Sequence, residues 1–463
     1  MRPAPWSGRR WAWATALVAV GTLALLSARH PGLRLVDFLG FSTRAHRLMA
    51  GEDLVHPLYP VGYPALLGIL QSLGITPILA GRALSVTAGG LAVGVTTRWF
   101  GAAAGLWLLV QPVFLTYGST EGTDLAAFSL GFAALWARSN ERPGLAGALA
   151  GLATLTRFTS AALLPALLLP PLHTTARKRA TVRTLIAFAA MTTPHWLVTL
   201  ATGAPLLPDQ SGNFAIGANA VVHGLGWDTI ARIPAGLRTA SPFLFSGPGV
   251  GLGLLVLLGV GAFAVHQRST RLADPVVRLL LWGLLHWGLV AAAFANARLV
   301  LPSRLCFALG LGLALRTRPR LLLAGSVALG LWTLPPSWNA SDSETRLARI
   351  VSALEQLDGP LRTGHFLTSD PWVYRQNGAY LQTGTPLREL GGDPRTIDAV
   401  QLARFARQRG YTLVVLDSGR IGRTYPGLLP LFEAPEQAEA LGLSPVTRVP
   451  GYRVFAVQPE ESP

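Results

Sequence analysis

The chain has little charge, one cysteine and one lysine among its 463 residues. Charged residues make up 13% of it, about half of the roughly 25% that is typical of soluble domains. The single cysteine, Cys306, excludes an intramolecular disulfide and a cysteine-based zinc site. Since 50% of the residues are hydrophobic, this composition excludes an ordinary water-soluble protein.

Acidic residues are especially scarce in residues 1–336, where nine stand against 26 lysines and arginines. Residues 337–463 hold 14 acidic and 13 basic residues and are nearly neutral. A net charge of +16 would suit a nucleic-acid binder, but such proteins gather their basic residues on one face or stripe. Here the arginines are spread along the chain between apolar runs. We therefore expect a membrane region at 1–336, a soluble domain at 337–463 and no nucleic-acid partner.

Eleven apolar runs are close in length to the about 20 residues that a helix needs to span a bilayer. They cover residues 11–28, 77–97, 102–118, 124–137, 143–156, 158–172, 183–201, 247–265, 276–295, 298–315 and 319–336. Arginine and lysine recur in every second connection, which places these connections and the N-terminus in the cytoplasm. The first run follows the same alternation, so it is interpreted as an uncleaved anchor rather than a signal peptide.

These observations predict a polytopic α-helical membrane protein with about 11 transmembrane helices and a small C-terminal α/β domain. We expect it in the cell (inner) membrane, in contact with membrane lipids, with a cytoplasmic N-terminus and an extracytoplasmic C-terminal domain. Three outer segments, 29–76, 202–246 and 337–463, are longer than ordinary connections. Within the first of them, the short apolar run 65–75 predicts an interfacial or re-entrant helix.

The last segment carries the pattern of a folded domain. Residues 398–409 have helical spacing, and the apolar stretch 411–416 that follows predicts a buried strand. The closing run 452–457 alternates as an edge or final strand does. A helix followed by a buried strand favours an α/β sheet.

In this topology seven of the nine acidic residues of the membrane region fall on the outer side. Asp37 follows the first span, while Glu121 and Asp124 stand between the third and fourth, so the three carboxylates can converge on one outward-facing site. A carboxylate there can accept a proton from an attacking hydroxyl or amine. The alternative interpretation is that acidic residues simply avoid the more positive face.

Arginines on the same side complement these acids. Arg157 and Arg298 stand at the outer ends of apolar runs, where the planar guanidinium suits a phosphate group. Each also fits a snorkelling arginine that contacts lipid headgroups. Arg82 and Arg304 are weaker candidates for the same role.

Nothing in the sequence assigns a metal or a cofactor. Neither His46 nor His56 stands at a metal-ligand spacing from another histidine. Metal ligands are therefore unknown, and dependence on a divalent metal is left open.

Five degenerate motifs follow one another in the sequence, namely Asp37-x3-Phe41-x3-Ala45-x5-Gly51, Tyr59-Pro60-Val61-Gly62-Tyr63-Pro64, Gly118-Ser119-Thr120-Glu121-Gly122-Thr123-Asp124, Gly147-x3-Gly151-Leu152-Ala153-Thr154-Leu155-Thr156-Arg157 and Arg298-Leu299-Val300-Leu301-Pro302. In this order they resemble the GT-C superfamily of membrane glycosyltransferases. They are similar to the branch that contains protein O-mannosyltransferases and the lipid A aminoarabinose transferase.

The resemblance implies an enzyme, a glycosyltransferase that moves a sugar from a polyprenyl-phosphate carrier to a lipid, glycan or protein acceptor on the outer face. Asp37 matches the catalytic base of this family. Glu121 and Asp124 match acidic positions that shape the donor or acceptor site. Arg157 and Arg298 match positions near the carrier phosphate.

His56, which precedes the second motif, and Tyr59, which is its first residue, are added to the predicted substrate-binding residues. Two departures leave the donor open. The usual tyrosine four residues after the catalytic aspartate is Phe41, and the lysine that binds donor phosphate in some relatives has no counterpart outside Lys178, which is predicted to face the cytoplasm.

Two rival functions are compatible with the same pattern. A transporter or lipid-carrier flippase would place ionisable residues or broken helices near the bilayer midplane, whereas these carboxylates stand at span ends. A non-catalytic binding or assembly protein of the same fold would keep its role after replacement of Asp37.

Overall fold

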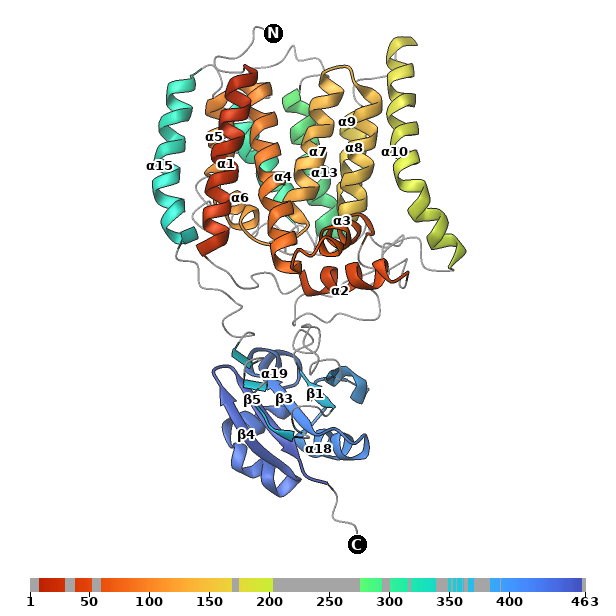
Figure 1. The fold of residues 1–463 in the computed structure, drawn as a ribbon, viewed down its shortest axis with the longest axis vertical. Coiled ribbons are helices and arrows are strands. Elements are labelled where there is room, and N and C mark those ends of the chain that lie inside the picture. The colour runs from red at the N-terminus through yellow and green to blue at the C-terminus, as the bar shows by residue number, and fades with distance from the viewer. Residues whose placement is uncertain are drawn as a thin grey trace. The chain divides into compact units, whose positions relative to one another are not determined.

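A computed structural model gives the fold of the chain (Figure 1). It describes residues 8–29, 38–51, 60–168, 175–202, 275–293, 300–314, 318–338 and most of 349–459. The chain divides into two compact units, one of Met1–Pro31, Arg44–Asn213 and Val222–Ala340 and the other of Gly32–Thr43, Phe214–Val221 and Ser341–Pro463. The predicted division at residue 336 stays a prediction.

The first unit is a bundle of helices that lie side by side (Figure 1). Its helices are α1 Arg9–Arg29, α3 Gly62–Ser72, α4 Pro77–Phe100, α5 Ala102–Leu109, α6 Pro112–Gly118, α7 Asp124–Ser139, α8 Pro143–Thr156, the 3₁₀ helix η1 Phe158–Leu163, α9 Leu164–Leu168, α10 Thr175–Ala201, α13 Pro275–Ala293, α14 Leu301–Ala314 and α15 Pro319–Trp338. Helix α2, Phe38–Met49, crosses the boundary between the two units.

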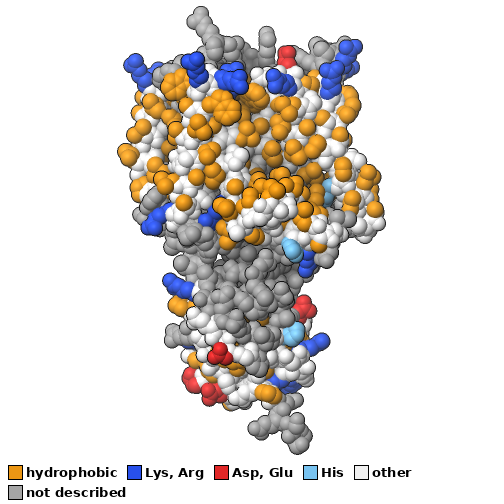
Figure 2. Space-filling view, viewed as in Figure 1, with side chains coloured by type: hydrophobic (Ala, Val, Ile, Leu, Met, Phe, Trp, Pro, Cys, Tyr) orange, Lys and Arg blue, Asp and Glu red, His pale blue; other side chains and the backbone are white. Residues whose placement is uncertain are grey.

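Three of the described helices are long and apolar enough to cross a membrane, namely Arg9–Arg29, Pro77–Phe100 and Lys178–Ala201. Shorter apolar helices cover Pro143–Thr156, Phe158–Leu168 and Pro275–Val290. Hydrophobic side chains cover much of the face of the bundle shown in Figure 2, and residues such as Leu17 and Leu331 are 67% and 74% exposed. A surface of this kind suits a lipid environment.

Most of the predicted runs coincide with helices, but two differ in detail. The predicted span 102–118 is two helices, α5 and α6, because Pro112 opens α6. Proline has no N–H and its ring clashes with the preceding turn, so a helix is interrupted there. The run 158–172 starts as the 3₁₀ helix η1 before α9. The run 247–265 and segment 202–246 lie largely outside the described residues.

A helix is present near the predicted segment 65–75 as α3, which packs against α4 and α8 at one end of the bundle (Figure 1), while its interfacial position stays a prediction. Gly68 of α3 lies against Ala45 and Met49 of α2. At only 11 residues, α3 is too short to span a bilayer.

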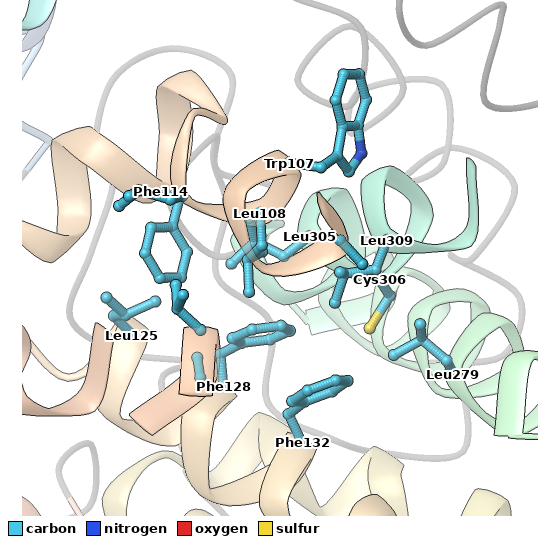
Figure 3. Close-up of a cluster of buried hydrophobic side chains, with 14 of the residues drawn as sticks. Trp107, Leu108, Phe114, Leu125, Phe128, Phe132, Leu279, Leu305, Cys306 and Leu309 are labelled. Atoms are coloured by element: carbon cyan, nitrogen blue, oxygen red, sulfur yellow. The ribbon is translucent and has the colours of Figure 1, made fainter. Parts of the chain in front are cut away.

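An aromatic cluster joins α7 to α13. Phe128 of α7 stacks on Trp282 of α13 with ring centroids 5.5 Å apart, and it also stacks on Phe132 at 5.8 Å. Figure 3 shows these phenylalanines in the surrounding cluster of buried leucines. Trp107 of α5 donates a hydrogen bond from its indole N–H to the carbonyl of Ala308, at 2.7 Å. Segments far apart in the sequence therefore share one core.

Helices α8 and α10 approach closely because glycine stands at their contact. A Cβ built on Gly147 would lie 2.1 Å from the carbonyl oxygen of Thr184. Small residues permit this close approach of membrane helices.

We expect Gly147→Ala to destabilise the bundle by about 1–3 kcal/mol, the usual cost of overpacking, and to lower its melting temperature in detergent. Gly144→Ala is the matched control, because a Cβ there meets nothing within 4 Å. Equal melting temperatures for the two variants would show that α8 and α10 do not pack this closely.

The second unit contains a five-stranded sheet in the order β2-β1-β3-β5-β4. The strands are β1 Phe366–Thr368, β2 Gly384–Pro386, β3 Leu413–Asp417, β4 Leu443–Val449 and β5 Tyr452–Val457. The helices are η3 Leu387–Leu390, α18 Ala399–Gln408, α19 Ser418–Thr424, η4 Pro426–Leu428, α20 Pro430–Glu433 and η5 Pro435–Leu441. Strand β1 is parallel to β2 and β3, whereas β5 is antiparallel to β3 and β4.

The sequence pattern of this unit is confirmed in three places. The predicted helix at 398–409 is α18. A reciprocal capping box between Asp398 and Gln401 stabilises its N-terminus. The buried strand predicted at 411–416 is β3, all five residues of which are buried. The final strand predicted at 452–457 is β5.

Candidate functional site

Charged residues of the bundle lie mostly toward its two ends, and arginines are present at both. Because successive helices run in opposite directions, the end of α1, the start of α4, the connection 119–123 and the end of α8 meet at one end, called here the acidic end. Among the described residues this end holds two carboxylates, Glu121 and Asp124. Lysines and arginines gather at the other end, the basic end, as the row of blue side chains in Figure 2 shows.

Glu121 forms a buried ion pair with Arg82 of α4. The Nε of Arg82 donates to a carboxylate oxygen of Glu121 at 3.2 Å, and the side chains are 8% and 0% exposed. Arg82 also donates from Nη1 to the carbonyl of Ser27, at the end of α1, at 3.2 Å. The guanidinium therefore connects three segments, α1, α4 and the connection 119–123.

Hydrogen bonds fix the backbone beside Glu121. The N–H of Gly122 donates to the hydroxyl of Tyr63, at 3.2 Å, and the hydroxyl of Ser85 donates to the carbonyl of Gly122, at 3.3 Å. Tyr63 is completely buried near the start of α3. The short helix α3 and α4 thus both hold the connection that carries the acidic residues.

Asp124 pairs with Arg157 at the start of α7. The Nη1 of Arg157 donates to this carboxylate, and to the hydroxyl of Thr123 at 2.8 Å. Arg157 is the residue that ends α8, in an extended backbone conformation, before η1 begins. A carboxylate in the first turn is also favoured by the helix dipole of α7. Arg157 retains 15% side-chain exposure, against 1% for Asp124.

A buried histidine lies within reach of this pair. The ring nitrogens of His286, on α13, are 3.1 Å from the hydroxyl of Ser303 and 3.2 Å from that of Thr159. The charges of Arg157 and Asp124 both act on His286. Polar contacts therefore join η1, the helix that follows Arg157, to α13 and α14.

Next to Glu121, the hydroxyl of Thr120 is buried and has no hydrogen-bond partner among the residues that the structure describes. Buried hydroxyls are normally bonded to protein, water or ligand. This hydroxyl adds a polar group with unused bonding capacity to the acidic end.

Three of the predicted site residues are described, and they lie at this end. Glu121, Asp124 and Arg157 come together there, but both carboxylates are buried and paired rather than open to water. The remaining four, Asp37, His56, Tyr59 and Arg298, lie outside the described residues.

Sequence reasoning undervalued Arg82 and did not single out Tyr63 or His286. The position of Arg82 near the outer end of an apolar run could have indicated a carboxylate partner, because an isolated charge there is costly. For His286, on an apolar helix, no sequence signal indicates the two hydroxyl partners. Within the described ranges, no group of three or more His, Cys, Asp or Glu side chains could hold a metal ion.

Solved structures show which fold this is. The chain has the same overall fold as two solved proteins, in agreement with the predicted resemblance. The crystal structure of ArnT from Cupriavidus metallidurans bound to undecaprenyl phosphate matches with a TM-score of 0.60 and 14% identity, over 97% of this chain and 98% of that one. The apo form of ArnT matches with a TM-score of 0.59 and 13% identity, over 96% and 97%.

A second solved protein has the same fold over part of its length. The arabinofuranosyltransferase AftD from Mycobacteria matches with a TM-score of 0.55 and 16% identity, over 99% of this chain and 40% of that one. Neither a family model nor a curated protein sequence matches the chain.

Proposed function

We propose that the chain is a membrane glycosyltransferase that moves a sugar from a polyprenyl-phosphate carrier to an acceptor on the extracytoplasmic face. The observation that carries the proposal is the match over nearly the full length of both chains to ArnT, which was solved with undecaprenyl phosphate bound. The arabinofuranosyltransferase AftD, which shares the fold, supports the same class of reaction. The resemblance of the motifs is an independent argument for it.

The row of basic residues at one end of the bundle supports the proposed orientation. Arg98, Arg142 and Arg320 are exposed at the basic end, and the positive-inside rule assigns such an end to the cytoplasm. The acidic end then faces the outside, with the N-terminus cytoplasmic and about 11 transmembrane helices in total. The unit that holds the sheet is in this proposal the extracytoplasmic domain.

The proposed reaction is a direct displacement at the anomeric carbon. Asp37 takes the proton of the acceptor hydroxyl or amine, whose oxygen or nitrogen forms a bond to the anomeric carbon. The bond from that carbon to the carrier phosphate oxygen breaks, and the polyprenyl phosphate leaves with the electron pair. General-base assistance of this kind contributes about 10²–10⁴-fold to a rate.

Arginines at the acidic end suit the leaving phosphate. Arg157 is partly exposed and is oriented by Asp124 and Thr123, so its guanidinium is held in a fixed direction. Arg298 is proposed to act beside it. Glu121, Asp124, His56 and Tyr59 are proposed to shape the donor and acceptor sites.

The alternative function is a transporter or flippase without sugar transfer. Such proteins place ionisable residues near the middle of the bilayer. In the described bundle the ion pairs lie at helix ends, at Asp124 in the first residue of α7 and at Arg157 just after α8. This position favours the transferase.

The test is sugar transfer in proteoliposomes that contain the purified full-length chain. Labelled polyprenyl-phosphate sugars are offered together with lipid, glycan and protein acceptors, and the transferred label is measured. We expect transfer from at least one pentose or hexose donor. Movement of the carrier lipid between leaflets, without release of polyprenyl phosphate from any donor, would instead identify a flippase.

A further inference from the structure

Two arginines lie at the basic end of the bundle, where α7 and α9 end and α13 begins. Arg138 lies in the last turn of α7, and Arg278 lies in the first turn of α13. The Nε of Arg138 donates to the carbonyl of Leu167, near the end of α9, at 3.1 Å. Helix α13 packs against both α7 and α9. The two guanidinium groups therefore belong to one junction.

Among the residues that the structure describes, the junction carries an excess of positive charge. Arg278 is only 4% exposed, and its Nε is buried with no hydrogen-bond partner among the described residues. The charge of Arg138 acts on Arg278, and the N-terminus of α13 adds the partial positive charge of a helix dipole. Glu141 acts on Arg138, but it is exposed.

Burial of a charged group without a counter-charge is costly, because the group loses its hydration. An anion at the junction removes this cost and supplies an acceptor for the Nε of Arg278. Guanidinium groups bind phosphate oxygens in paired, charge-assisted hydrogen bonds.

We propose that Arg138 and Arg278 bind the phosphate of an anionic phospholipid headgroup at the basic end of the bundle. The source is a lipid because the junction lies at the basic end of the bundle, where a row of blue side chains borders the hydrophobic face in Figure 2, and anionic headgroups lie at such a boundary. Arg142, exposed in the adjoining connection, adds a further positive charge. The site is at the opposite end from Glu121 and Asp124, so it is independent of the proposed transfer reaction.

The test uses the full-length chain purified in detergent and titrated with phosphatidylglycerol or with zwitterionic phosphatidylcholine. We expect native mass spectrometry to show one tightly held phosphatidylglycerol and a saturable rise in melting temperature. In Arg278→Gln and Arg138→Gln the dissociation constant should rise about tenfold or more, as expected for the loss of one charge-assisted hydrogen bond. The dissociation constant of Arg278→Lys should lie between those of these variants and that of the wild type.

Arg320→Gln is the matched control, because Arg320 is an exposed arginine in the first turn of α15 at the same end. It should bind phosphatidylglycerol as the wild type does. Equal binding by the wild type, Arg278→Gln and Arg138→Gln would overturn the proposal. Equal stabilisation by inorganic phosphate alone would overturn the lipid source.

Asp274 stands four residues before Arg278 in the sequence, and Asp274→Asn tests a counter-charge from within the chain. We expect this variant to bind phosphatidylglycerol at least as tightly as the wild type. The proposal would be overturned if phosphatidylglycerol does not stabilise the wild type and Asp274→Asn melts at a lower temperature than the wild type. These two results together would assign the counter-charge to Asp274.

Discussion

Asp37→Asn is expected to lower sugar transfer by about 10²–10⁴-fold while the protein remains folded, because asparagine cannot accept the proton of the acceptor. Asparagine has nearly the shape of aspartate, and Asp37 belongs to a predicted loop rather than to a predicted span. The loss should therefore appear in the rate of transfer and not in the yield or melting temperature. The measurement compares initial rates in proteoliposomes at equal protein content.

Asp53→Asn is the matched control. Asp53 belongs to the same predicted outer segment and stands two residues after Gly51, which turns the chain with φ 77°, and no catalytic role is proposed for it. It should transfer at the wild-type rate. Equal rates for Asp37→Asn and the wild type would remove Asp37 from the mechanism, even if the protein proves to be a glycosyltransferase.

Local patterns predicted the bundle because a bilayer restricts the chain so strongly. Apolar length alone placed α4 at 77–97, where the structure has Pro77–Phe100, and α8 at 143–156 with the same bounds. The break between α5 and α6 was missed, although Pro112 is a local signal, because the apolar run continues through it. Hydrophobicity measures contact with lipid and does not report the backbone hydrogen bonds that a proline removes.

The partners within the site could not be predicted in the same way. Glu121 and Asp124 were recognised from residue type and position, but their arginine partners are 39 and 33 residues away in the sequence. Such pairs depend on how helices are placed around one another, which a single sequence does not encode in a local pattern. Tyr63 and His286 were missed for the same reason, since each bonds to a segment distant in the sequence.

Glu121→Gln is expected to destabilise the bundle by about 3–5 kcal/mol, because it leaves the guanidinium of Arg82 buried without this counter-charge. The ion pair has an Nε to oxygen distance of 3.2 Å, and Glu121 is fully buried. The loss should appear as a lower melting temperature and poor recovery of monodisperse protein in detergent. The control is Arg320→Gln, which removes an exposed charge and should melt as the wild type does.

The double variant Arg82→Met with Glu121→Gln separates a structural role from a role in substrate binding. Replacement of both charges removes the buried cation together with its lost partner, so stability should return toward that of the wild type. If Glu121 only holds α4 and α1 together, the double variant should also transfer sugar. If Glu121 contacts donor or acceptor as proposed, the double variant should fold without transfer. A Glu121→Gln single variant as stable as the wild type would show instead that the Arg82 pair does not hold the acidic end together.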